Sequence, residues 1–230
     1  MLNFMRWKFM TDSGTDSGWG RCLPCKSRQS LGCMLIVLAE LAAAQTAIST
    51  QTAISTGVDA DAGLPFWEIR ESGMSLRLVQ RLPDQTRAFF LARGFARADV
   101  DLIAQGCVFQ TIFKNTSQTD KPSVLEYNLR DWKVQVADAV RGLKTREDWA
   151  AQWAARGVPQ PAKIAFEWAL LPTRQVYNPG DYNWGMSVFD LPPDSHFDLE
   201  VIWQQYGSRH TAVLKNIHCA PDVSVEAELP

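Results

Sequence analysis

The best indication of the fold is Asp198-Leu199-Glu200-Val201-Ile202-Trp203, because polar and apolar side chains alternate along it. In an extended chain Leu199, Val201 and Trp203 fall on one side, and Asp198 and Glu200 fall on the other. A period of two residues is typical of a strand that packs one face on a core and turns the other to water. The sequence therefore predicts an antiparallel strand here.

The same alternation recurs along much of the chain. Residues rich in Pro, Gly, Asn and Asp separate the alternating segments, as at 178–181 and 191–194. About eight strands joined by such turns predict a mainly β chain. The further segments are Met74–Gln80, 107–113, 124–129, 132–137, 163–171, 184–189 and 211–218.

Helices are predicted to be few and short. Asp84 can begin a helix over 84–93, and a second segment spans 98–105. A third is predicted over 145–156, where Thr145 and Asp148 have the spacing of a capping box. These three helices are insertions in a β chain.

The order of the predicted elements favours one fold class. Strands that follow one another through turns, with two or three short inserted helices, predict an antiparallel β-sandwich that is immunoglobulin-like in architecture. The alternative is an α+β layer fold. A doubly wound parallel sheet is not expected, because strands and helices do not alternate regularly.

The N-terminal region differs from the rest of the chain. Basic residues precede an apolar run over 33–44, so residues 1–44 have the pattern of a signal peptide or N-terminal leader. An uncleaved membrane anchor and a buried helix are the alternatives. Residues 45–63 contain a duplicated Thr-Ala-Ile-Ser-Thr and are expected to be a flexible linker. Residues 64–230 then form a single β-rich domain.

Two cysteines remain after the expected leader, Cys107 and Cys219. Each is placed at the end of a predicted strand. An even number of cysteines in an exported domain favours a disulfide bond. Two buried free thiols, or a ligand pair for a soft metal, are the alternatives.

Histidines and methionines in the domain could bind a metal. Imidazole and thioether groups suit copper, so copper is the cofactor the sequence raises. Ordinary surface histidines and packing methionines would explain the same residues. The candidate ligands are Met74, Met186, His196, His210 and His218.

Aromatic residues gather around a predicted turn near residue 180. Tyr177, Tyr182 and Trp184, together with Trp132, could form an aromatic platform for a sugar or a peptide. Alternatively, Tyr182 and Trp184 close one end of the core. A separate Asn115-Thr116-Ser117 sequon would be glycosylated only in a eukaryotic secretory pathway.

Catalytic motifs are absent from the sequence. It contains neither a Gly-x-Ser-x-Gly elbow nor a His-Glu-x-x-His zinc motif. Carboxylate pairs occur at Asp198 with Glu200 and at Glu147 with Asp148, and a hydrolase could use such a pair. Acidic pairs are also common on solvated surfaces, so they do not by themselves indicate an enzyme.

Composition narrows the function further. A net charge of −2 gives no basic field for nucleic acid, and 46% hydrophobic residues supply a core. We therefore expect an exported, non-enzymatic accessory or binding protein, periplasmic or extracellular, with copper handling as its most specific form. Its partner is an unknown protein or small ligand. The alternatives are a secreted hydrolase using loop carboxylates and a membrane-tethered assembly factor whose N-terminal segment stays in the membrane.

Overall fold

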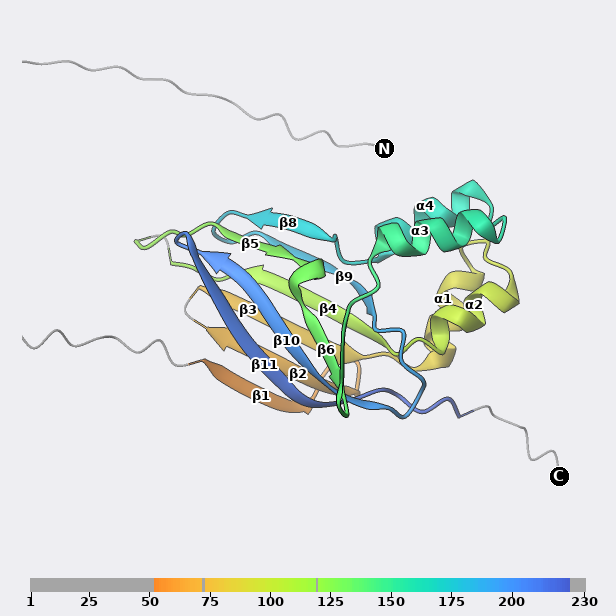
Figure 1. The fold of residues 1–230 in the computed structure, drawn as a ribbon, viewed down its shortest axis with the longest axis horizontal. Helices are drawn as coiled ribbons and strands as arrows, with labels where there is room; N and C mark the ends of the chain where they lie inside the picture. The colour runs from red at the N-terminus through yellow and green to blue at the C-terminus, as the bar shows by residue number, and fades with distance from the viewer. Residues whose placement is uncertain (1–51, 72, 119, 224–230) are drawn as a thin grey trace, which may run out of the picture. The chain divides into compact units, whose positions relative to one another are not determined.

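The computed structural model describes residues 52–71, 73–118 and 120–223, which form two antiparallel sheets with helices gathered near one end (Figure 1). The expected leader, residues 1–44, lies outside the described residues. No helix among those described is long and apolar enough to cross a membrane.

The first sheet has five strands in the order β1-β2-β3-β4-β9. Strands β1, β2 and β3 each pair with the next strand in the chain, so β1 to β4 form a meander. The edge strand β9 then returns to pair with β4. The strands are β1 (Ala53–Val58), β2 (Pro65–Glu71), β3 (Met74–Gln80), β4 (Val108–Asn115) and β9 (Tyr182–Val188).

The second sheet is organised around the long strand β10. Strand β11 pairs with one side of β10, and β5 and β6 pair with different parts of β10, separated by a short 3-10 helix. Strands β8 and β7 extend the sheet beyond β5 and β6. The strands are β5 (Leu125–Asn128), β6 (Lys133–Val136), β7 (Ala139–Gly142), β8 (Arg174–Tyr177), β10 (His196–Gln205) and β11 (Ser208–His218).

The main core lies between the two sheets. Leu199, Val201 and Trp203 are buried there, as their alternation predicts. They pack in one cluster with residues of the first sheet such as Leu76 and Phe109. The antiparallel sandwich expected from the sequence is thus confirmed.

A second core lies between the helices and the outer face of the first sheet. Met186 and Val188 of β9 pack there with Phe90, Trp153 and Phe166 from the helices. Trp149 and Trp153 stack on one face of α3, as their spacing predicts. The helices are α1 (Pro83–Leu91), α2 (Arg97–Ala104), α3 (Arg146–Ala155) and α4 (Gln160–Ala169).

Helix α4 corrects one sequence prediction. Residues 163–171 were expected to be a strand, because Ile164, Phe166, Trp168 and Leu170 alternate with other residues. The structure instead buries Ala162 and Phe166, four residues apart, and leaves Ile164 and Trp168 exposed. The segment also contains Ala165, Glu167 and Ala169, which favour helix over strand.

Strand β1 differs from the expected flexible linker at 45–63. Residues Ala53–Val58 pair along their whole length with β2. All six residues are exposed, so no buried face imposes the apolar alternation that would mark them as a strand. The folded part therefore begins before Leu64.

The immunoglobulin-like expectation holds only for the two-sheet architecture. In an immunoglobulin sheet the strands do not follow one another in chain order, because Greek-key connections cross between the sheets. Here β1 to β4 are consecutive neighbours. The strand order therefore gives no support to immunoglobulin identity.

Two features connect the sheets covalently and by hydrogen bonds. Cys107, just before β4, is bonded to Cys219, just after β11, with their Cα atoms 5.2 Å apart. Asn115 at the end of β4 is fully buried, and its Nδ2 donates to the carbonyl oxygens of Ser123 and Tyr177. The expected disulfide is therefore present, and the asparagine of the sequon is a buried structural residue.

Candidate binding site

Three large aromatic side chains are exposed near the junction of α4 and β9. Trp168 near the end of α4 is 83% exposed, Trp184 of β9 is 58% exposed, and Tyr182 of β9 is 63% exposed. Large aromatic residues are usually buried, so an exposed group of them on one part of a surface calls for an explanation.

Trp168 and Trp184 line a common pocket of about 310 Å³. We call it the tryptophan pocket. Both charged and apolar groups contribute to its wall. The remaining lining residues are Arg146, Glu167, Leu170, Pro172 and Asn183.

The wall of the tryptophan pocket depends on how the chain leaves α4. After α4 the chain runs along β9, where the Leu171 amide donates to the carbonyl oxygen of Met186 at 2.9 Å. A Cβ atom at Gly185 would lie only 2.6 Å from the Leu171 nitrogen and 2.9 Å from the Leu170 carbonyl carbon. The absence of a side chain at Gly185 therefore allows the segment to approach β9 and bring Leu170 and Pro172 to the pocket.

We expect Gly185→Ala to destabilise the domain by about 2–3 kcal/mol, because its methyl group meets backbone atoms that cannot rotate away. Urea unfolding followed by circular dichroism measures this. Gly142→Ala is the matched control, since a Cβ there meets nothing within 4 Å, and it should change stability by less than about 1 kcal/mol. Equal losses of stability in the two variants would contradict the close approach of the Leu170 and Leu171 backbone to Gly185.

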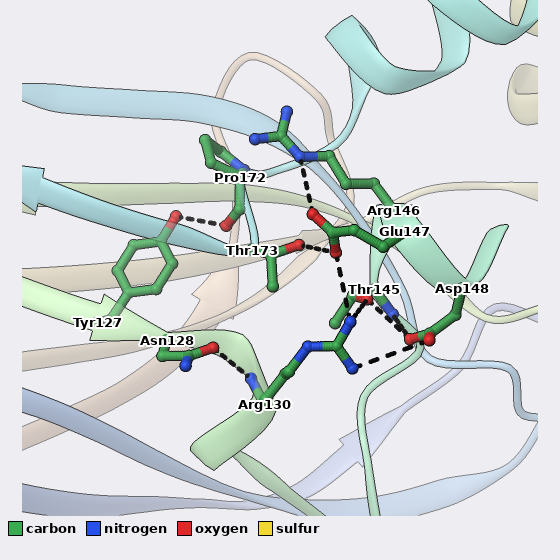
Figure 2. A network of polar contacts seen from close by, with 9 residues as sticks. All are labelled: Tyr127, Asn128, Arg130, Thr145, Arg146, Glu147, Asp148, Pro172 and Thr173. Atoms are coloured by element: carbon green, nitrogen blue, oxygen red, sulfur yellow. Dashed lines mark hydrogen bonds and ion pairs between the residues drawn. The ribbon is translucent and has the colours of Figure 1, made fainter. Parts of the chain in front are cut away.

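A polar network beside the pocket holds two of its lining residues (Figure 2). Arg146 begins α3, and its Nε lies 3.8 Å from Glu147 Oε1. Glu147 also accepts a hydrogen bond from Thr173 Oγ1 at 2.5 Å. The Pro172 carbonyl oxygen accepts a hydrogen bond from the Tyr127 hydroxyl at 3.1 Å. The network therefore fixes the start of α3 against the segment that forms the pocket wall.

The capping box at the start of α3 is confirmed. Both the backbone nitrogen and the hydroxyl of Thr145 donate to Asp148 Oδ2, at 2.8 and 2.7 Å (Figure 2). Arg130 lies near both acidic side chains, 3.6 Å from Glu147 and 3.8 Å from Asp148. The network thus joins α3 to the 3-10 helix between β5 and β6.

The electrostatics of this network favour ionised carboxylates. Burial alone would raise the pKa of Glu147, but hydrogen bonds from Thr173 and Thr145 outweigh it and leave that pKa lowered. Hydrogen bonds from the Thr145 side chain and backbone lower the pKa of Asp148. A general acid needs a raised pKa, so Glu147 and Asp148 suit a structural role better than a hydrolytic one.

The other carboxylate pair lies on the outer face of the second sheet. Glu200 binds Lys133 at 3.0 Å, and Asp198 accepts a hydrogen bond from the Asn216 amide at 2.7 Å. These partners give each acid a structural role on an open sheet face. Both acids line a surface pocket of about 390 Å³, where each is half-buried and already has a partner.

The predicted aromatic platform is only partly assembled. Tyr182 and Trp184 are on the surface, which contradicts the alternative that they close the core. Tyr177 is buried in the main core, where its hydroxyl donates to the Tyr127 hydroxyl at 3.2 Å. Trp132 is also buried, with its indole nitrogen donating to the Ile202 carbonyl oxygen. Tyr177 and Trp132 therefore cannot contact a surface ligand.

The five predicted metal ligands do not converge. Met74 is buried between the sheets, and Met186 is buried beneath the helices. His210 stacks on Trp203 and lies 3.2 Å from Glu71. Among the described residues, no group of three or more His, Cys, Asp and Glu side chains is arranged to hold a metal ion.

Two of those ligands do meet. His196 and His218 lie opposite each other on β10 and β11, and their rings stack with centroids 4.4 Å apart. Nδ1 of His196 is 2.9 Å from Asn216 Oδ1, and Nε2 of His218 is 2.8 Å from Asp194 Oδ1. Each ring thus has one nitrogen in a hydrogen bond, and its other nitrogen has no hydrogen-bond partner among the residues that the structure describes.

The sequence prediction missed most of the tryptophan pocket. Trp168 was expected on one face of a strand with Phe166, whereas the helix places it with Ile164 on an exposed face. No local sequence pattern marks Arg146, Glu167 and Asn183 as pocket residues, because only the fold brings them together.

Comparisons with known proteins give no relative for this chain: no family model, curated protein or solved structure matches it. The tryptophan pocket and the histidine pair are therefore the observations on which functional proposals rest.

Proposed function

We propose that this chain is an exported binding protein without catalytic activity, and that the tryptophan pocket is its ligand site. The observation that carries the proposal is the exposure of Trp168 and Trp184 at one pocket. Binding sites combine apolar surface with a few placed polar groups, and Arg146, Glu167 and Asn183 supply those groups.

The geometry of the pocket supports binding better than chemistry. Its single acidic residue, Glu167, comes with the cationic Arg146 and no second carboxylate in the lining. Glycoside hydrolysis generally needs two carboxyl groups across the scissile bond. The pocket therefore favours holding a ligand over cleaving it.

Export is supported by two observations. The Cys107–Cys219 disulfide is of the kind that persists in oxidising compartments. The pattern of residues 1–44 is that of a leader. N-terminal sequencing of the exported protein distinguishes a cleaved leader from a membrane tether: a chain that starts after Ala44 supports export, and one that retains residues 1–44 supports a tethered assembly factor.

The test of the binding site is a ligand screen with tryptophan variants. We expect Trp168→Ala and Trp184→Ala each to weaken binding at least about tenfold, because each removes a stacking surface. The screen covers oligosaccharides, peptides and small aromatic compounds, with affinity measured by calorimetry. Tyr206→Ala is the control, since Tyr206 is 64% exposed and does not line the pocket. Ligands whose affinity is unaffected by both tryptophan changes would place the site elsewhere.

Copper handling is a second proposal, which His196 and His218 would now carry. Neutral imidazole nitrogens bind copper, and a ligating histidine often donates its other nitrogen to an oxygen, as Asp194 and Asn216 permit here. We expect His196→Ala/His218→Ala to abolish binding of Cu²⁺ in calorimetry at neutral pH, and His210→Ala to retain it. Equal binding by the double variant and the unchanged protein would remove this pair as the site.

A further inference from the structure

We infer that the ligand of the tryptophan pocket is a carbohydrate, bound as a chain of neutral sugar rings. The inference rests on the proposed function, because it names the ligand class for the same site. Three features of the described residues carry it. They are the exposed indole faces, the balanced polar lining and a third aromatic ring further along β9.

The indole faces match one side of a sugar ring. A pyranose presents C–H groups on its face and hydroxyl groups around its edge. Trp168 and Trp184 offer broad flat apolar surfaces whose ring faces carry partial negative charge, which suits polarised C–H groups. Tryptophan also has few rotatable bonds, so little conformational freedom is lost when a ligand stacks on it.

The polar lining matches the hydroxyl groups. Arg146 donates only, Glu167 accepts only, and Asn183 does both. Hydroxyl groups both donate and accept, so a sugar can pair with donors and acceptors of both kinds. The formal charges of Arg146 and Glu167 cancel, which favours a neutral ligand. A phosphate or a uronic acid would meet the Glu167 carboxylate as a like charge.

Part of the polar lining is held in position before any ligand arrives. The Glu147 carboxylate lies beside the Arg146 guanidinium, and Pro172 is fixed through the Tyr127 hydroxyl (Figure 2). A site whose side chains are already placed loses less entropy on binding. This arrangement suits a weakly interacting ligand such as a sugar.

Tyr182 extends the surface beyond the pocket. It is two residues before Trp184 in β9, so both side chains project from the same face of the strand. Same-face positions in a strand are about 6.5–7 Å apart along the chain. Tyr182 does not line the pocket, so it can stack on a neighbouring ring of a linked ligand. The site therefore fits an oligosaccharide better than a monosaccharide.

The experiment measures binding of the exported, disulfide-bonded domain to defined oligosaccharides of one to six units by calorimetry. Neutral glucose, mannose and N-acetylglucosamine series are compared with a galacturonate series and with proline-rich decapeptides. We expect a neutral series to bind, with affinity rising with chain length. Trp168→Ala and Trp184→Ala should each reduce affinity at least about tenfold for every length that binds.

Tyr182→Ala supplies the sharper result. It should weaken binding of the longer oligosaccharides about fivefold to tenfold and leave binding of the single sugar unit unchanged. Tyr206→Ala should change neither, and circular dichroism checks that each variant is folded. An equal effect of Tyr182→Ala on all lengths, or no dependence on length, overturns the chain ligand.

The remaining outcomes separate this inference from the proposed function. Tryptophan-dependent binding of the proline-rich peptides or of galacturonate alone overturns the neutral carbohydrate and leaves the binding site in place. If neither the sugars nor the peptides bind in a tryptophan-dependent way, the inference is overturned, and the proposed function is overturned as well when the small aromatic compounds of the ligand screen also fail to bind.

Discussion

Replacing both Cys107 and Cys219 with alanine is expected to lower the free energy of unfolding by about 4–5 kcal/mol. The two residues are 112 positions apart, and cross-linking so long a segment removes much entropy from the unfolded chain. The bond also joins the start of β4 in the first sheet to the end of β11 in the second. For a domain of this size, such a loss lowers the melting temperature by roughly 10–20 °C.

Urea unfolding of the double variant and calorimetric melting measure the effect. The unchanged domain unfolded in the presence of a reductant is the control, and it should approach the stability of the variant. A loss below about 1 kcal/mol would contradict the disulfide as a major source of stability.

The second large effect is expected for Asn115→Asp. This isosteric change replaces the Nδ2 donor with an oxygen that faces the carbonyl oxygens of Ser123 and Tyr177, which lie 2.7 and 3.0 Å from Nδ2. Two buried acceptors lose their donor, and the new carboxyl group is itself buried. We expect a loss of roughly 3–5 kcal/mol.

Asn128→Asp is the matched control for that change. The Asn128 Oδ1 accepts a hydrogen bond from the Arg130 amide at 3.0 Å, which an aspartate oxygen can also accept. Its stability in urea should stay within about 0.5 kcal/mol of the unchanged domain. Similar losses for the two variants would show that Asn115 does not act through its Nδ2 donor.

Side-chain alternation predicted several strands that bury one face, but it missed β2, β7 and β8. Met74–Gln80 is β3 with the predicted bounds, and the stretch 198–203 lies within β10. Side-chain alternation did not predict β1, whose six residues are all exposed, because a strand without a buried face does not require polar and apolar residues to alternate. It also failed at α4, where alternating apolar residues fall on different sides of a helix.

The candidate site was harder to predict, because burial depends on the partner of each strand. Tyr177 pairs with Leu125 and turns into the core, whereas Tyr182 pairs with Lys114 and turns to solvent. Nothing local to these tyrosines distinguishes the two environments. The surface position of Trp168 depends on two features that its local sequence does not reveal. They are the helical conformation of α4 and the close approach of the chain after α4 to Gly185 of β9.

The hydrogen bond from the Leu171 amide to Met186 has a consequence for detecting ligands. It fastens the segment that carries Leu170 and Pro172, so the amide hydrogen of Leu171 exchanges with solvent only when this segment opens locally. A ligand in the tryptophan pocket contacts that segment and resists its opening. Slower deuterium uptake at Leu171 would therefore report occupancy of the tryptophan pocket at the segment that forms its wall.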